Sequence, residues 1–165
     1  RAITLVRNDN VLPLSASGSK VLVVGSRAGF VKEFGEALGK TGANVSVVTF
    51  DDHPTADQAA QVQQAAGSVD AVVALTYNVA ENTEQTDLVN ALHGAGRKVI
   101  AVAVGNPYDV GRYGSAAALC TYSDQSLMAT PLATIITGGR KPEGKLPVAI
   151  PTSQGAIPVG TGLSW

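Results

Sequence analysis

"VDAVVALTYNVAENTEQTDLVNALHGAGRKVIAVAV" (residues 69–104) joins two apolar runs through one amphipathic stretch. The runs at 71–75 and 99–104 consist of Val, Ile, Ala and Leu and lack the polar alternation of a strand with one face in water. Between them, residues 83–96 have a helical pattern that ends in glycines. Buried strands joined by a helix are typical of a parallel sheet that helices cover on both faces.

The same alternation of strand and helix continues on both sides of this segment. The patterns predict strands at 20–26, 44–50 and 116–122 and helices over 30–42, 55–66 and 123–138. Thr55 is expected to cap the second of these helices, Ser123 to cap the third, and Pro131 to kink or divide it. We therefore predict an α/β fold, a three-layer αβα sandwich with a mostly parallel, doubly wound sheet.

The segment "GGRKPEGKLPVAIP" at 138–151 follows the last predicted helix and is rich in glycine and proline. Gly138 allows a left-handed helix stop, and Pro142 with Gly144 favours a turn. Because Pro147 cannot donate a backbone hydrogen bond, a strand at 146–150 belongs at a sheet edge. We expect an antiparallel C-terminal edge strand there.

Length and pattern predict one domain for the 165 residues. We divide it into an N-terminal strand and linker at 1–19, a sandwich at 20–151 and a C-terminal tail at 152–165. The strand-like "AITLVRND" is interpreted as a tether. The chain begins without methionine and is expected to be a piece of a longer protein.

Composition excludes several classes of partner. Hydrophobic residues make up 45% and charged residues 15% of the chain, with a formal net charge of −1 and no cluster of basic residues. We therefore expect neither nucleic acid nor membrane as a partner. Cys120, the only cysteine, cannot form an internal disulfide and is expected to be a small buried hydrophobe.

The sequence lacks the residue patterns of several known binding and catalytic motifs. The turn after the first parallel strand, at 25–30, lacks both glycine-rich phosphate-binding patterns and is expected to be a plain turn. Adjacent side chains at 51–53 point in different directions and do not close a metal site, so no metal is expected. Ser153 lies in no nucleophile elbow, and His93 is expected near the negative end of a helix. A phosphoryl-accepting receiver domain is also excluded, because the sequence lacks the cluster of acidic residues that such a site requires.

Two loops at the carboxyl ends of predicted strands are rich in polar groups, and ligands meet open parallel sheets at such loops. Residues 76–84 and 105–113 supply aromatic rings, amides and charges that suit sugar hydroxyls and ring faces. The substrate-binding candidates are Tyr77, Asn78, Asn106, Tyr108, Asp109 and Arg112, and the weak acid/base candidates are Glu81 and Glu84. The alternative is that Glu84 completes a capping box and that Asn106 to Asp109 only shape a turn into a short helix.

Five segments together carry a family resemblance that covers nearly the whole chain: "RAITLVRNDNVLPL", "VVALTYNVAENTEQTDLVNAL", "KVIAVAVGNPYDVGRY", "AAALCTYSDQSLMATPLATIITGGRKPEGKLPVAIP" and "GTGLSW". The chain resembles the C-terminal α/β-sandwich domain of glycoside hydrolase family 3. The pattern P-x-G-K-L-P-V-x-I-P at 142–151 is the most specific match. The "NPYD" turn and the short loop between Thr76 and Gln85 are most similar to the two-domain bacterial β-N-acetylglucosaminidases.

The resemblance implies a partner, an N-terminal (β/α)8 barrel of the same polypeptide that carries the aspartate nucleophile of a retaining mechanism. In β-glucosidase-like members the sandwich donates a glutamate acid/base from the loop after its third strand. Here Gln85 matches that motif, but the long loop and its Gly-Asp pair are missing. This difference weakens the assignment of Glu81 or Glu84 as the acid/base. In the other branch a His-Asp pair of the barrel does this work. Gly105 also departs from a position that is often charged in the family.

The resemblance thus implies an accessory domain, inactive alone, that shapes a pocket for β-linked N-acetylglucosamine or glucose saccharides. It implies no cofactor and an extracellular or cell-envelope location. The alternative hypotheses are a free-standing sugar-binding or interaction module of the same fold and, third, a nucleotide-binding domain.

Overall fold

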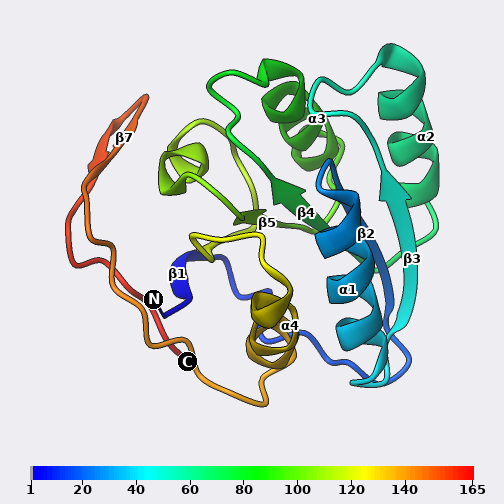
Figure 1. The fold of residues 1–165 in the computed structure, drawn as a ribbon, viewed down its shortest axis with the longest axis horizontal. Coiled ribbons are helices and arrows are strands. Elements are labelled where there is room, and N and C mark those ends of the chain that lie inside the picture. The colour runs from blue at the N-terminus through cyan, green and yellow to red at the C-terminus, as the bar shows by residue number, and fades with distance from the viewer. Residues whose placement is uncertain (1) are drawn as a thin grey trace.

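The structure, a computed structural model, describes residues 2–165, which form three layers with a sheet between two layers of helices (Figure 1). The elements, in chain order, are β1 (Thr4–Asn8), β2 (Lys20–Gly25), α1 (Ala28–Gly39), β3 (Asn44–Thr49), α2 (Ala56–Ala66), β4 (Ala71–Thr76), α3 (Thr83–Gly94), β5 (Val99–Ala103), the 3₁₀ helix η1 (Pro107–Gly111), β6 (Ala117–Cys120), the 3₁₀ helix η2 (Ser126–Met128), α4 (Ala129–Ile136), β7 (Ile150–Thr152) and β8 (Gly155–Ile157).

The main sheet has six strands in the order β1-β6-β5-β4-β2-β3. Strands β2 to β6 are parallel, and β1 is antiparallel to β6. The chain runs outward from β2 to β3, returns past β2 to β4 and then continues in the opposite direction. The order therefore reverses between β2 and β4, so the topological switch point of the sheet lies at the carboxyl ends of those two strands.

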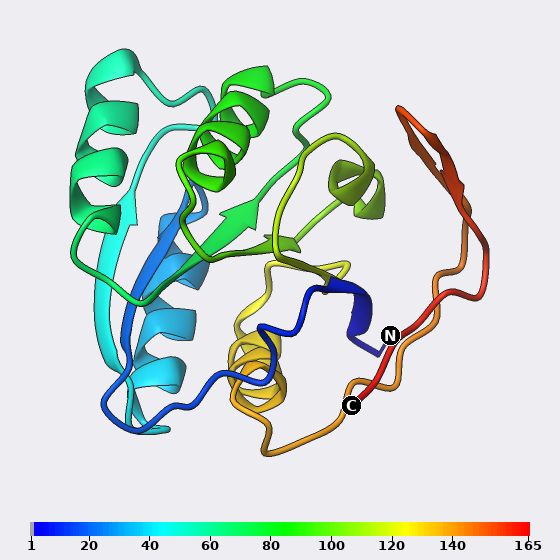
Figure 2. The same ribbon diagram turned by 180° about the vertical axis from the view of Figure 1, so that it is seen from behind.

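Two apolar clusters lie on opposite faces of the sheet and explain why the central strands lack polar alternation. α1 and α4 cover one face, where Phe34 and Leu132 are fully buried, and α2 and α3 cover the other, where Val62 and Leu92 are fully buried (Figures 1 and 2). Every residue of β5 is buried. Each such aliphatic side chain contributes about 1.5–3 kcal/mol relative to an exposed one, so this double-faced burial dominates the stability of the fold.

The predicted α/β sandwich is confirmed, and so are most of its local details. Thr55 forms a capping box with Gln58 at the start of α2, and His93 lies in the last turn of α3. The helix expected over 123–138 is divided into η2 and α4. Because Pro131 falls in the first turn of α4, its missing N–H costs no hydrogen bond within α4.

The predicted edge strand at 146–150 is wrong. Only Ile150 of this range lies in a strand, and its strand β7 pairs antiparallel with β8 in a separate two-stranded sheet. The antiparallel edge of the main sheet is β1. Pro142 and Pro147 interrupt the backbone donors of the C-terminal segment, so it makes isolated hydrogen bonds in place of a ladder.

The N-terminal segment expected as a tether supplies this edge strand, and the C-terminal tail covers it. Gly144 N donates to Ile3 O at 3.0 Å, and Leu163 N donates to Leu5 O at 2.8 Å. Both views place the two chain ends beside one another (Figure 2). Residues far apart in the sequence therefore seal one edge of the sheet together.

Candidate functional site

The two polar loops predicted from the sequence do meet at the carboxyl ends of β4 and β5, and Asp109 joins them. Its Oδ1 accepts a hydrogen bond from Val79 N at 3.1 Å, and its Oδ2 accepts one from Thr76 Oγ1 at 3.3 Å. The side chain is 1% exposed. The carboxylate of Asp109 is thus engaged by the loop after β4 and is almost fully shielded from solvent.

A buried polar chain extends from Asp109 toward the core. The Tyr113 hydroxyl lies 2.9 Å from Thr76 Oγ1, and Tyr113 is itself buried. Burial raises the pKa of Asp109 to about 6, opposed by its hydrogen bonds from Val79 and Thr76. Burial also raises the pKa of Tyr113, and raises that of the Cys120 thiol to about 12. Cys120 is therefore a protonated, buried thiol, as the sequence predicted.

Glycine at position 105 is explained by packing. A Cβ at Gly105 would lie 3.1 Å from Cε1 of the Tyr77 ring and 3.2 Å from Asn78 Oδ1. These contacts are tighter than ordinary van der Waals contacts, so a side chain here would push the loops after β4 and β5 apart.

Arg27 is the main residue of this region that the sequence reasoning missed. Its guanidinium carbon lies 3.4 Å from the centre of the Tyr77 ring, a cation–π stack. Its nitrogens also lie 3.7 Å from Asp52 Oδ2 and 3.9 Å from Asp124 Oδ2. Because Arg27 follows β2 and Tyr77 follows β4, this stack lies at the switch point of the sheet.

Gln85 is buried beneath this stack and fixes the loops around it. Its Oε1 accepts from Tyr77 N at 3.0 Å, and its Nε2 donates to Asp52 O at 2.8 Å. The Asn82 side chain adds a hydrogen bond to Tyr77 O at 2.9 Å. Buried amides that are fully partnered in this way fix backbone positions, so Gln85 and Asn82 hold the base of the Arg27–Tyr77 stack.

Of the two acid/base candidates, Glu84 is paired with an imidazole and Glu81 is exposed. Glu84 Oε1 lies 2.9 Å from His53 Nδ1, and this contact lowers the pKa of Glu84 and raises that of His53. Glu84 completes no capping box, because Asn82, the N-cap of α3, makes no side-chain capping bond. Glu81 is exposed and belongs to none of the ion pairs within residues 2–165.

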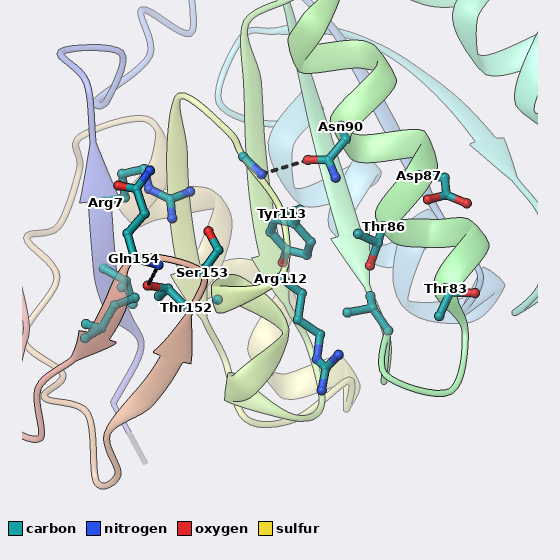
Figure 3. A pocket seen from close by; sticks show the side chains of 15 residues that line it. Arg7, Thr83, Thr86, Asp87, Asn90, Arg112, Tyr113, Thr152, Ser153 and Gln154 are labelled. Atoms are coloured by element: carbon teal, nitrogen blue, oxygen red, sulfur yellow. Dashed lines mark hydrogen bonds between the residues drawn. The ribbon is translucent and has the colours of Figure 1, made fainter.

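A large groove lies between α3 and the β7–β8 hairpin and has a volume of about 950 Å³ (Figure 3). Arg112, Asn90 and Ser153 line it, and its single carboxylate is Asp87. Gly111 packs directly against the hairpin, because a side chain there would overlap the carbonyl oxygen of Pro151. The hairpin is thus a fixed wall of this groove.

A smaller groove of about 400 Å³ collects four of the six predicted substrate-binding residues, Asn106, Tyr108, Asp109 and Arg112. Asn106 Oδ1 accepts from Tyr108 N at 2.9 Å and caps η1, so the predicted turn into a short helix is present. Tyr108 is 41% exposed, and Arg112 is exposed as well. The other two, Tyr77 and Asn78, lie outside this groove, at the Arg27 stack and beside Gly105.

Two further searches of residues 2–165 are negative. No three His, Cys, Asp or Glu side chains gather as metal ligands there, and none of the helices there is long and apolar enough to cross a membrane.

Comparison with known proteins finds one family. The family described as "Glycosyl hydrolase family 3 C-terminal domain" matches residues 3–163. A glycoside hydrolase family 3 β-N-acetylglucosaminidase from Paenibacillus sp. str. FPU-7 is 26% identical with a TM-score of 0.75, over 94% of this chain and 30% of that chain. A search of curated proteins finds no match.

Two more distant structures share the fold. A fungal multi-domain family 3 β-N-acetylglucosaminidase is 22% identical with a TM-score of 0.78, over 96% of this chain and 19% of that one. A β-D-glucoside glucohydrolase from Trichoderma reesei is 18% identical with a TM-score of 0.64, over 92% and 29% of the two chains. This chain therefore spans less than a third of the length of each of these structures.

Proposed function

The chain belongs to the glycosyl hydrolase family 3 C-terminal domains, and we propose that it is the accessory domain of a retaining family 3 glycoside hydrolase. In this proposal it packs on a catalytic (β/α)8 barrel of the same polypeptide and forms one wall of the sugar pocket. The substrates are saccharides with β-linked N-acetylglucosamine or glucose. The domain is inactive without the barrel and uses no cofactor.

The observation that carries the proposal is the environment of the carboxylates. A retaining glycosidase places two carboxyl groups roughly 5 Å apart around the scissile bond. Glu84 faces His53, Asp109 is buried under backbone donors, and Asp87 is the single carboxylate of the large groove. Family membership, with Glu84 and Asp109 engaged by other partners and Asp52 and Asp124 both held by Arg27, supports a domain that relies on groups outside residues 2–165.

Tyr108, Asn106 and Arg112 are the residues we assign to the sugar-facing wall. They lie together in one groove at the carboxyl end of β5, and the Tyr108 ring is available to solvent. Exposed aromatic rings pack on sugar ring faces, and amides and guanidinium groups donate hydrogen bonds to hydroxyls. Asp109 holds this wall in place from behind, so we assign it a structural role.

A hydrolysis assay tests the accessory role. Purified residues 1–165 should release no p-nitrophenol from the N-acetyl-β-glucosaminide or the β-glucoside. Turnover that disappears in Glu81→Gln or Glu84→Gln would overturn the proposal.

A fusion of this domain to the remaining part of the Paenibacillus enzyme should hydrolyse these substrates. Tyr108→Ala in that fusion should raise KM roughly fivefold, since one ring contact contributes about 1 kcal/mol. Lys40→Gln, at the C-cap of α1, is the matched control.

The alternative, a free-standing sugar-binding module, is favoured by the groove around Tyr108, which exists without any partner domain. Calorimetry with N-acetylglucosamine separates the two functions. A single wall of a pocket should give no measurable heat, whereas a complete module should bind the sugar and lose that binding in Tyr108→Ala.

A further inference from the structure

The strand β3 forms an open edge of the main sheet, because β2 is its single neighbour among the described residues. Asn44 N donates to Ser19 O and Phe50 N donates to Gly25 O, so the even-numbered residues face β2. Alternate residues of a strand direct their N–H and C=O groups to opposite sides. Val45, Val47 and Thr49 therefore present their backbone donors and acceptors outward.

This edge lacks the features that keep sheet edges apart. Its sequence, Asn-Val-Ser-Val-Val-Thr, contains no charge and no proline, and its register with β2 is continuous over all six residues. The opposite edge, β1, has an irregular register between Leu5 and Arg7 and is covered by Gly144 and Leu163. Charges, bulges and covering segments are the usual protection against edge-to-edge pairing, and β3 has none of them.

The side chains of β3 also leave apolar surface uncovered. Val45 and Val47 pack toward Gly35 on the α1 side of the sheet, while Val48 packs on the α2 side. Val47 is nevertheless 38% exposed, one of the few large apolar side chains of the domain with that much surface in water. Cross-strand pairs of β-branched residues are favourable, so this surface suits another β-strand.

We propose that β3 pairs antiparallel with β3 of a second copy of this chain, about a two-fold axis at Val47. In this register Val47 faces its own copy and Val45 faces Thr49, so the three outward residues of each strand exchange about six backbone hydrogen bonds. The two sheets become continuous across the axis. This inference is independent of the proposed function.

The charges at this edge favour a second copy as the partner. In the register centred on Val47, Asp51 faces Ala43, so the two-fold axis brings no like charges together. The charges of α1, which packs on β3, are balanced: Lys32, Glu33 and Glu36 lie within the helix, and Lys40 is its C-cap. A symmetric interface needs a self-complementary surface, and an uncharged strand beside a helix of balanced charge meets that condition.

Sedimentation equilibrium of residues 1–165 from about 1 µM to 1 mM tests the proposal, because a short edge interface gives weak, concentration-dependent dimers. The wild-type chain should form dimers within this range. Val47→Lys, which places two lysines opposite each other, should weaken dimerisation at least tenfold. A mixture of Val47→Lys and Val47→Glu chains should associate again, which only self-facing Val47 residues explain.

Leu127→Lys, at an exposed apolar residue of η2, is the control and should dimerise like the wild type. Amide exchange of the wild-type chain gives a measurement that needs no variant: exchange at Val45, Val47 and Thr49 should slow as the concentration rises. A monomer at every concentration, or a dimer that Val47→Lys leaves unchanged, would overturn the proposal.

Discussion

Asp109 and Glu84 are both carboxylates of the polar loops at the carboxyl ends of the strands, yet their surroundings are opposite. Asp109 is 1% exposed, and its oxygens accept from Val79 N and Thr76 Oγ1. Glu84 faces water and pairs with His53. The pKa of Asp109 is raised to about 6 by burial, whereas the pKa of Glu84 is lowered by its imidazole partner.

The difference teaches how this edge of the sheet is built. Asp109 is a joint that links the loops after β4 and β5, and removing it leaves Val79 N buried without its acceptor. Glu84 and Arg27 belong to an outer layer in which solvent can replace each lost contact. Mutations in the joint should therefore affect folding strongly, and mutations in the outer layer should affect it little.

The largest effect is expected from Asp109→Ala. At pH 4 this substitution leaves Val79 N buried without its acceptor, removes a partner of the Thr76 hydroxyl and empties a buried site, which together cost about 3 kcal/mol of unfolding free energy. The corresponding fall in Tm is roughly 8 °C for a domain of this size. Asp109→Asn, which keeps one acceptor oxygen, is the control and should lose about 1 kcal/mol at pH 4, where Asp109 of the wild type is protonated. Equal stability of Asp109→Ala and the wild type in urea unfolding at pH 4 would refute this role of Asp109.

The pH dependence of stability should carry the signature of Asp109. Its folded pKa of about 6 lies above the ordinary value of 3.8, so the folded state holds this proton more tightly than the unfolded state does. The stabilisation from protonated Asp109 is complete below about pH 4 and is lost as the pH rises through 6, by about 3 kcal/mol at most. The difference in unfolding free energy between wild type and Asp109→Asn, measured from pH 4 to 7.5, should follow this curve. A flat difference would show that Asp109 titrates normally.

The sequence predicted the layers of the fold because uninterrupted apolar runs such as residues 99–104 leave a strand no face for solvent. It could not predict the role of Asp109, because polarity alone does not show that η1 turns this carboxylate inward. The stack of Arg27 on Tyr77 depends on β2 and β4 being neighbours. Chain order does not show spatial order, and these residues are 50 positions apart.

The C-terminal edge was misassigned for a similar reason. Alternation and Pro147 indicated an edge strand at 146–150, but two segments competed for the same sheet edge. β1 contains no proline and can pair with β6 through a ladder, so it takes the position. Pattern identifies segments that suit an edge, whereas competition between distant segments decides which one occupies it.

A smaller effect is expected from Arg27→Met. The substitution removes the stack on Tyr77 and the contacts with Asp52 and Asp124, but Arg27 is partly exposed and water replaces much of what is lost. We expect a loss of about 1 kcal/mol and a fall in Tm of roughly 3 °C. Arg27→Lys keeps the charge without the planar stack, so its unfolding free energy should lie between those of the wild type and Arg27→Met. A loss of unfolding free energy as large as that of Asp109→Ala would show that Arg27 does not belong to an outer layer whose contacts water can replace.

The smallest effect on folding is expected from Glu84→Gln, because both members of the His53 pair face solvent. The raised pKa of His53 means that the pair stabilises the fold below the ordinary pKa of His53 and loses this effect as the pH rises through the raised value. The lowered pKa of Glu84 means that this stabilisation is also lost in acid, as the pH falls through the lowered pKa. The pair therefore stabilises the fold in the pH window between the titrations of Glu84 and His53.

Glu84→Gln should leave Tm unchanged while NMR titration shows the pKa of His53 falling toward 6.5. Glu81→Gln, on the same loop but away from the imidazole, should leave the His53 titration as it is, and an unchanged His53 pKa in Glu84→Gln would mean that the contact does not persist in solution.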